Sequence, residues 1–224
     1  MTVAYPGGKV ALDRVSFQVS PGENVALVGG NGAGKTTLLL AMVGILPAQS
    51  GEIFVGQTKL GKKTRRWVRS RVGLVFQNPD DQLFMPSVYE DIAFGPRNFG
   101  FDEIQVAKLA EDAMGWLGIE HLRDRPPFCL SAGEKRLCAI AAVLATQPEY
   151  LLFDEPTAFL DPRSKRRLSE VVAALPQGKI IATHDLAFAE ELCGRVLILK
   201  DGTLVAEGGL GLLNDKTVLE KAGL

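Results

Sequence analysis

The stretch VALVGGNGAGKTT, residues 25–37, decides the fold. Its first four residues form a short apolar run without alternation, which is typical of a strand buried on both faces. The next eight residues match the pattern GxxxxGK[ST], and a helix-like stretch follows at residues 37–43. Strand, glycine-rich loop and helix in this order predict a phosphate-binding loop.

The loop has the residue types that this chemistry requires. Four glycines allow the backbone to wrap a polyphosphate with its N–H groups inward, and the helix start directs its positive end at the anion. We expect Lys35 to reach the β- and γ-phosphates and the Thr36 hydroxyl to ligate Mg²⁺. A glycine-rich turn that binds nothing is the alternative. The residues expected to bind nucleotide here are Gly29, Asn31, Gly32, Ala33, Gly34, Lys35, Thr36 and Thr37.

Outward from the loop, further strand signals predict an α/β domain. Helical stretches separate most of the apolar runs, so the sheet is expected to be largely parallel. Residues 15–20 alternate apolar and polar, which predicts a half-exposed antiparallel strand, and Asp201-Gly202 predicts a two-residue hairpin. The other buried-strand runs are residues 72–76, 150–153, 179–182 and 195–199.

Residues 87–145 interrupt this alternation of strands and helices. They contain no buried-strand run, and Pro126-Pro127 separates the amphipathic residues 104–117 from the apolar residues 137–144, which indicates a helical insertion. We therefore expect one domain over residues 1–224, with an α/β core at about 1–76 and 146–209, a helical subdomain at about 77–145 and a short C-terminal helix at about 210–224.

Two acids end the apolar run YLLFDE, residues 150–155. Because buried carboxylates are costly without a compensating cation, we expect Asp154 to hold Mg²⁺ through water. Glu155, on the opposite strand face, is expected to act as general base for an attacking water, a role worth roughly 10²- to 10⁴-fold in rate. An acid pair that merely caps the turn at Pro156 is the alternative.

A second helix start has anion-binding character. Ser131 and Glu134, three residues apart, form a capping-box pattern, and the N–H groups around Ala132 and Gly133 would be exposed at the helix start. A well-capped helix without a ligand is the alternative.

These motifs, in this order, resemble those of the nucleotide-binding subunit of an ABC transporter over nearly the whole chain. The resemblance implies an ABC ATPase fold, with a P-loop NTPase core, an antiparallel β subdomain and a helical insertion. It implies an ATPase that binds ATP and Mg²⁺ between two subunits of a homodimer or paralogous heterodimer. The phosphate loop of one subunit would face the signature of the other, formed here by Ser131, Ala132, Gly133 and Glu134.

The same resemblance assigns four further positions. Tyr5 would stack on adenine, Gln77 would contact Mg²⁺ and sense a membrane partner, and Asp161 would be the acid of the D-loop. His184 would contact the γ-phosphate and act with Glu155 and Gln77 in catalysis, although a lone histidine after a buried strand is more often a structural residue.

Residues 76–84, FQNPDDQLF, and 88–96, VYEDIAFGP, resemble the ATPases of energy-coupling factor transporters, especially cobalt and nickel importers. The resemblance implies a groove for an integral membrane partner and a peripheral location on the cytoplasmic face of the membrane. Alternatively, Leu83, Phe84, Ile92 and Phe94 are simply core residues. Other possible functions are a soluble ABC ATPase of DNA repair, translation or cofactor assembly, and the ATPase of another ABC importer.

Three positions depart from the family pattern. Ala132 replaces a usual glycine, Leu137 a usual arginine, and Phe159 makes the D-loop bulky. Ala132 and Leu137 leave open a degenerate, regulatory subunit in a heterodimer. The chain also has little of the usual first strand before Tyr5.

The composition excludes several classes of protein. The 224 residues include 25 basic and 26 acidic side chains, a net charge of −1, which argues against a nucleic-acid-coating protein. No signal peptide or apolar run of about 18 residues is evident. The three cysteines are expected to be reduced core thiols, and no site for the transported metal is apparent. The basic run over residues 59–71 fits a solvated helix face, or contact with anionic lipid or a partner.

Overall fold

The computed structural model describes the backbone of residues 1–223, which form two compact units. The first, here called the sheet unit, comprises Met1–Leu74, Glu149–Glu155 and Pro176–Leu224. The second, the helical unit, comprises Val75–Pro148 and Pro156–Leu175. The structure thus groups residues 156–175 with the helices, whereas the sequence expectation placed them in the α/β core.

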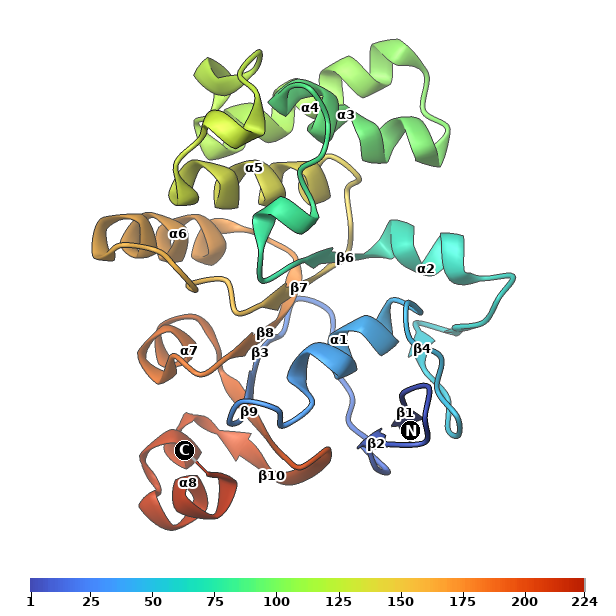
Figure 1. Ribbon diagram of the computed structural model, residues 1–224, viewed down its shortest axis with the longest axis vertical. Helices are drawn as coiled ribbons and strands as arrows, with labels where there is room; N and C mark the ends of the chain where they lie inside the picture. The colour runs from blue at the N-terminus through green and yellow to red at the C-terminus, as the bar shows by residue number, and fades with distance from the viewer. Residues whose placement is uncertain (224) are drawn as a thin grey trace. The chain divides into compact units, whose positions relative to one another are not determined.

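A six-stranded sheet with the order β10-β9-β3-β8-β7-β6 forms the centre of the sheet unit (Figure 1). Strand β3 pairs in parallel with β8 and β9, β7 pairs in parallel with β8, and β10 is antiparallel to β9. The predicted, largely parallel sheet is therefore confirmed. Its strands are β3 (Asn24–Val28), β6 (Val72–Val75), β7 (Tyr150–Asp154), β8 (Gly178–Thr183), β9 (Arg195–Lys200) and β10 (Thr203–Gly209).

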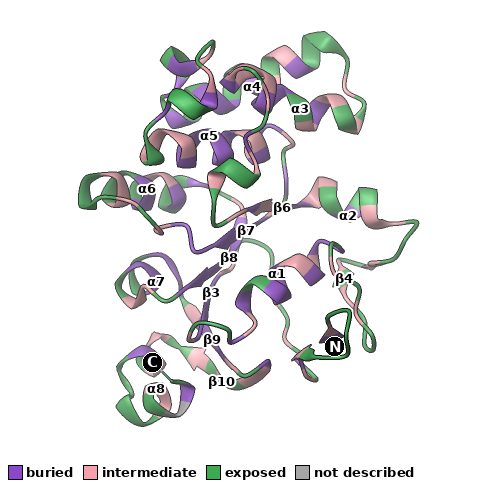
Figure 2. Cartoon of the chain, viewed as in Figure 1, coloured by how far each residue is buried: buried purple, intermediate pink, exposed green. Residues whose placement is uncertain are grey.

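The continuous apolar runs form the core strands because both faces of the sheet are covered. Val25 to Val28 are 0% exposed, and the purple strands of Figure 2 show the same burial along the sheet. Helix α1 (Lys35–Met42) contacts β7, and α7 (Leu186–Leu192) contacts β3 and β8. The remaining elements of the sheet unit are β1 (Val3–Ala4), β2 (Val10–Leu12), β4 (Phe54–Val55), β5 (Thr58–Lys59), α2 (Arg65–Arg71), η4 (Leu210–Asn214) and α8 (Lys216–Ala222).

The predicted hairpin at Asp201-Gly202 joins β9 and β10. Both residues have positive φ, 47° and 77°, as the two-residue turn between twisted antiparallel strands requires. A side chain at Gly202 would place its Cβ 2.5 Å from the Ala11 carbonyl oxygen, so glycine is also needed for close packing. Local turn chemistry was sufficient to predict this element.

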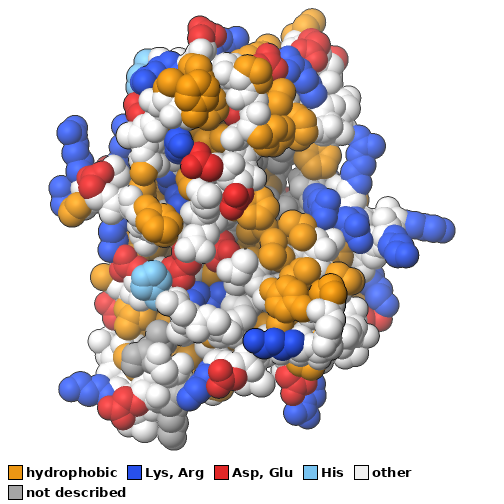
Figure 3. Space-filling view, viewed as in Figure 1, with side chains coloured by type: hydrophobic (Ala, Val, Ile, Leu, Met, Phe, Trp, Pro, Cys, Tyr) orange, Lys and Arg blue, Asp and Glu red, His pale blue; other side chains and the backbone are white. Residues whose placement is uncertain are grey.

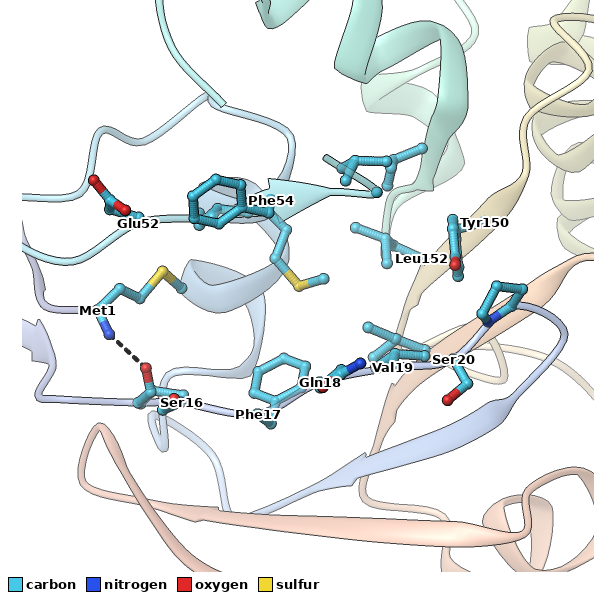
Figure 4. Close-up of a pocket in the computed structure, with 18 residues that line it drawn as sticks. Met1, Ser16, Phe17, Gln18, Val19, Ser20, Glu52, Phe54, Tyr150 and Leu152 are labelled. Atoms are coloured by element: carbon cyan, nitrogen blue, oxygen red, sulfur yellow. Dashed lines mark hydrogen bonds between the residues drawn. The ribbon is translucent and has the colours of Figure 1, made fainter. Parts of the chain in front are cut away.

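The predicted strand over residues 15–20 is wrong. The segment is extended but is not assigned as a strand, because a strand needs a hydrogen-bonded neighbour along its edge. Within residues 1–223 that pairing is confined to Val15, whose N–H donates to Met1 O and whose carbonyl accepts from the Met1 amine. The rest of the segment borders a groove of about 550 Å³, with Glu52 and Phe54 on its other side (Figure 4). None of the predicted nucleotide-site residues lines this groove.

The helical unit contains the expected helices. Its helices α3 (Val88–Phe99), α4 (Glu103–Leu117) and α5 (Ala132–Leu144) contact one another, and α5 also contacts α6 (Pro162–Ala174). Helix α4 is amphipathic, with one buried face that includes Val106, Ala110 and Leu117. Three short 3₁₀ helices belong to the same unit: η1 (Pro79–Asp81) precedes α3, and η2 (Glu120–Leu122) and η3 (Pro127–Cys129) lie between α4 and α5.

Two of the three cysteines are core residues, as expected from the sequence, and one is not. Cys138 and Cys193 are buried, and burial raises the pKa of each thiol to about 12, so both are unreactive core residues. Cys129 is exposed, because it ends the surface 3₁₀ helix η3 rather than facing the core. No described helix is both long enough and apolar enough to cross a bilayer.

Candidate nucleotide-binding and catalytic site

The phosphate loop joins β3 to α1 through backbone geometry that glycine permits. Gly34 is the N-cap of α1 with φ 105°, and a Cβ there would lie 2.9 Å from the Leu12 side chain. A Cβ on Gly29 would lie only 2.3 Å from the Leu199 carbonyl oxygen. Helix α1 begins at Lys35, two residues before the expected start, so Lys35 and Thr36 lie in its first turn, where the free N–H groups gather.

Lys35 is held inside the loop. Its side chain is 7% exposed, and its ammonium donates hydrogen bonds to the carbonyl oxygens of Gly29 at 2.7 Å and Gly30 at 3.3 Å. The same nitrogen lies 3.2 Å from Glu155 Oε1. Both partners of this ion pair are buried, so removal of either charge would leave the other uncompensated.

Glu155 lies at a turn just after β7, with φ 44°, which is uncommon for a residue with a side chain. From the sequence, Glu155 is expected on the strand face opposite Asp154. That alternation does not apply, because the strand ends at Asp154. The Glu155 N–H donates to Ala182 O at 2.8 Å, which ties this turn to β8. The backbone thus directs the Glu155 side chain toward the phosphate loop.

His184 follows β8 and completes the cluster. Its backbone N–H donates to Glu155 Oε2 at 3.2 Å, and its Nδ1 lies 2.8 Å from the same oxygen. The imidazole is 63% exposed, so its other face remains open to a ligand. One carboxylate therefore contacts the phosphate-loop lysine through one oxygen and the histidine through the other.

Residues suited to a magnesium ion lie at the ends of two of these elements. Asp154, 4% exposed, ends β7, and Thr36 is exposed in the first turn of α1. Carboxylate and hydroxyl oxygens are the hard ligands that Mg²⁺ prefers, with phosphate and water completing the shell. Within the described residues, no group of three or more His, Cys, Asp or Glu side chains could hold a metal without such help. The donor set fits Mg²⁺ that arrives with a nucleotide.

Tyr5 and Thr37, both predicted to bind nucleotide, are in contact. The Tyr5 hydroxyl lies 2.8 Å from Thr37 Oγ1, and Tyr5 is 40% exposed. The loop after β1 therefore holds an aromatic ring at the start of α1, where it remains accessible from solvent.

The helical unit contains the predicted second helix start. Ser131 Oγ accepts from the Glu134 N–H at 3.3 Å, and the Ser131 N–H donates to Glu134 Oε2 at 2.8 Å, so the capping box is present. This backbone hydrogen bond is the main reason that the pKa of Glu134 is lowered. Ala132 is exposed, and a Cβ on Gly133 would lie 2.7 Å from Ser164 Oγ.

Ser164 connects this helix start to the D-loop. Asp161 is the N-cap of α6 and accepts from the N–H groups of Arg163 at 2.9 Å and Ser164 at 3.1 Å. Its pKa is lowered, chiefly because the Ser164 hydroxyl also donates to it at 2.5 Å. Nearby, Phe159 is 83% exposed with φ 63°. Gly133 and Asp161 therefore share one packing neighbour.

Sequence reasoning missed Arg136. Its guanidinium is buried, at 1% exposure, and donates at 2.6 Å to both the Phe76 and Gln77 carbonyl oxygens. Leu137, noted as a departure from the family pattern, is buried as well, at 5% exposure. An arginine directly before the apolar residues 137–144 was the available signal. Arg136 holds the loop that presents the exposed Gln77.

The two segments that resemble the energy-coupling factor ATPases, residues 76–84 and 88–96, contain both core and surface residues. Leu83 and Ile92 are buried, at 7% and 0% exposure, whereas Phe84 and Phe94 are 62% and 42% exposed. The two phenylalanine rings contact each other edge to face, with centroids 5.0 Å apart. The core interpretation therefore holds for Leu83 and Ile92 only, whereas Phe84 and Phe94 form an exposed aromatic pair.

A phosphate loop, a buried lysine–glutamate pair and a histidine at the ends of parallel strands define a nucleotide-binding ATPase of the P-loop class. The ABC transporter family model matches residues 12–158, about two thirds of the chain. The chain therefore belongs to the ABC transporter family, as an ATP-binding subunit with the ABC ATPase fold.

Three relatives and one solved structure agree with this assignment. An ABC transporter ATP-binding protein of Gloeobacter violaceus is 47% identical over 99% of this chain and 92% of its own. The cobalt import ATP-binding protein CbiO of Rhodobacter capsulatus is 44% identical, covering 100% and 82%. The energy-coupling factor transporter ATP-binding protein EcfA of Carboxydothermus hydrogenoformans is 40% identical, covering 100% and 84%.

The solved structure is cbiO1 of Clostridium perfringens, described as part of the ABC transporter complex cbiONQ. It superposes with a TM-score of 0.85 at 36% identity, covering 98% of this chain and 90% of that chain.

Proposed function

We propose that this chain is the ATP-hydrolysing subunit of an energy-coupling factor type importer that transports cobalt or nickel ions. The ATPase mechanism rests on one observation, the contact of Glu155 with both Lys35 and His184 beside the phosphate loop. The subfamily assignment is supported by the names of the CbiO and EcfA relatives and by the run of residues 76–84.

In this proposal the nucleotide exchanges one ion pair for another. The γ-phosphate of ATP competes with Glu155 for the Lys35 ammonium, because both are anions within reach of the same cation. The Glu155 carboxylate is then available to accept a proton from the attacking water, while His184 directs a ring N–H to the γ-phosphate. The loop N–H groups and the start of α1 bind the phosphates, and Tyr5 stacks on adenine.

Thr36, Asp154 and Gln77 would hold Mg²⁺, with Asp154 acting through water. When bound, Mg²⁺ neutralises charge on the β- and γ-phosphate oxygens. The chain presents these oxygen ligands next to the phosphate loop, at the end of β7 and on the loop that Arg136 holds. The transported metal would bind another subunit.

We further propose that two such subunits form a dimer, as a homodimer or with a paralogue. The signature of each, Ser131 with its neighbours, would bind the nucleotide on the phosphate loop of the other, and Asp161 would line the contact. The exposed Phe84–Phe94 pair would receive an apolar helix of the integral membrane partner, since exposed aromatic pairs are frequent anchors in interfaces. The subunit would then lie at the cytoplasmic face of the membrane.

The variant Glu155→Gln tests the catalytic role. Glutamine keeps the size of the side chain but cannot accept the proton, so we expect kcat to fall about 10²- to 10⁴-fold while ATP binding remains and a dimer accumulates. Turnover, equilibrium binding of ATP and sizing chromatography measure the three effects. The matched control is Glu149→Gln, whose partner is the surface residue Arg71 and which should keep normal turnover. Full activity of Glu155→Gln would disprove the assignment.

Co-purification tests the transport role separately. We expect an integral membrane protein to accompany the chain in detergent extracts. Purification with ribosomes or DNA instead would overturn the transport role and favour a soluble ABC ATPase.

A further inference from the structure

The surface around α2 carries a dense positive charge. Seven basic residues occur between residues 59 and 71, and no acidic residue occurs from residue 53 to residue 79. Figure 3 shows lysine and arginine side chains gathered over α2 and extending beyond it into solvent. We call this region the α2 surface: Lys59, Lys62, Lys63, Arg65, Arg66, Trp67, Arg69 and Arg71.

Only part of this charge is neutralised within the protein. Lys59 pairs with Glu52, and Arg71 pairs with Glu149 at 2.8 Å. Lys62 and Lys63 are exposed and have no ion-pair partner among the residues that the structure describes. After both ion pairs are counted, the α2 surface retains an excess of positive charge.

Arg65 and Arg69 show how closely the cations are placed. Arg69 donates to Val43 O at 2.9 Å and to Gly44 O at 3.3 Å, so it fastens α2 to the end of α1. The pKa of Arg69 is lowered, first by desolvation and second by the charge of Arg65. Like charges held together on a rigid helix favour an anionic ligand that lies outside the chain.

An exposed indole lies among these cations. Trp67 is 41% exposed, whereas its neighbour Val68 is 0% exposed and anchors α2 in the core of the sheet unit. The Arg71 guanidinium lies 5.6 Å from the centre of the Trp67 ring. Tryptophan and long basic side chains together are typical of surfaces at the membrane–water interface, where the ring and the aliphatic stems lie at the headgroup level.

We infer that the α2 surface binds the anionic phospholipid headgroups of a bilayer. The inference draws on the proposed function only for a location at a membrane, and it goes beyond it because the lipid contact needs no protein partner. Headgroup phosphates complement the exposed lysines, and Trp67 supplies the apolar contact that a purely electrostatic surface lacks.

Lipid fits the whole molecule better than nucleic acid does. The net charge of −1 would oppose a long polyanion that tracks over the rest of the protein. A bilayer meets one face only, so a local basic surface is sufficient for attraction within a Debye length of about 8 Å at physiological salt.

Vesicle binding tests the inference with the full chain and no transporter present. We expect the protein to sediment with phosphatidylglycerol-containing vesicles, to bind pure phosphatidylcholine vesicles at least tenfold more weakly, and to dissociate at 0.5 M salt, which shortens the Debye length to about 4 Å. In a Trp116→Phe background Trp67 is the remaining tryptophan, and its fluorescence should shift to the blue on binding. Equal binding to both vesicle types, or an unchanged Trp67 spectrum, would overturn the inference.

Charge reversal identifies the surface. Lys62→Glu with Lys63→Glu should weaken binding to the anionic vesicles by about 25-fold or more, since each basic side chain contributes about fivefold. The matched control, Arg163→Glu with Arg166→Glu, reverses two exposed cations on α6 and should bind like the unmodified chain. Equal losses in both variants would indicate attraction by overall charge and contradict the assignment to α2. Tighter binding to a single-stranded oligonucleotide than to vesicles would overturn the choice of lipid.

ATPase activity without vesicles provides an independent readout. Neither lysine belongs to the proposed nucleotide site, so turnover of the Lys62→Glu, Lys63→Glu variant should be unchanged. Normal turnover with lost vesicle binding would support the lipid contact, whereas intact vesicle binding would refute it without affecting the ATPase proposal.

Discussion

Gly29 and Gly32 belong to the same loop, yet the structure constrains them differently. A Cβ on Gly29 would lie 2.3 Å from the Leu199 carbonyl oxygen, a backbone atom that cannot move without displacing β9. Gly32 has φ 79°, but a Cβ there would meet nothing within 4 Å. At the first position alanine would meet an obstacle, whereas at the second it would meet only an unfavourable backbone conformation.

We therefore predict unequal losses of stability. Gly29→Ala should lower the free energy of unfolding by about 3 kcal/mol through overpacking, and Gly32→Ala by about 1 kcal/mol through backbone strain. Urea denaturation without nucleotide measures both. Gly194→Ala, with an ordinary φ and open space around its Cβ, is the control and should change stability by less than about 0.5 kcal/mol. Equal effects at positions 29 and 32 would contradict the packing argument.

Contacts from helix α5 hold the loop of residues 76–84 in place. Gln82 bridges them, since its Oε1 accepts from the Phe76 N–H at 3.2 Å and its amide donates to Ala139 O at 2.7 Å. Lys135 pairs with Asp80 at 2.6 Å, and Arg136 holds the Phe76 and Gln77 carbonyls from the buried side. The helix that starts at the signature therefore also positions the loop that presents Gln77.

Removal of the buried contact should loosen this loop. We predict that Arg136→Met lowers the free energy of unfolding by about 3 kcal/mol, because two carbonyl oxygens lose a charged donor. Hydrogen exchange in residues 76–84 should accelerate as well. In Lys135→Met, which removes a surface ion pair, the loss should stay below about 1 kcal/mol. Unchanged exchange in Arg136→Met would show that the loop does not depend on α5.

The elements that could be predicted from sequence have local signals. The phosphate loop, the Asp201-Gly202 hairpin and the Ser131 capping box each depend on residues a few positions apart, and all three are present. Residues 15–20 have an equally clear local pattern, the alternation of apolar and polar residues. A strand also needs a hydrogen-bonded neighbouring strand, and alternation does not show whether one is present. Long-range contacts could not be predicted either: Glu155 and His184 are 29 positions apart in the sequence, and no local pattern indicates that they pair.

At the scale of the whole molecule, the two features that we propose bind the phosphates of ATP lie on separate units of each chain. The phosphate loop and Lys35 belong to the sheet unit, and Ser131 belongs to the helical unit. If each ATP lies between two chains, as we propose, then a chain damaged in one feature still supplies the other. Subunit mixing can distinguish that arrangement from a site completed within a single chain.

Two inactive variants should therefore restore activity when they are mixed. Lys35→Met removes the phosphate-loop cation, and Ser131→Arg blocks the signature, so each homodimer should be nearly inactive. A mixed dimer has one site in which the intact loop of the Ser131→Arg chain faces the intact signature of the Lys35→Met chain. Random pairing in equal amounts should recover up to about a quarter of the sites, measured as ATP turnover after the chains are refolded together. Turnover that stays at the level of the separate variants would place the complete site within one chain and refute the dimer proposal. As the control, each variant is refolded in the same way without the other, and its ATP turnover should not increase.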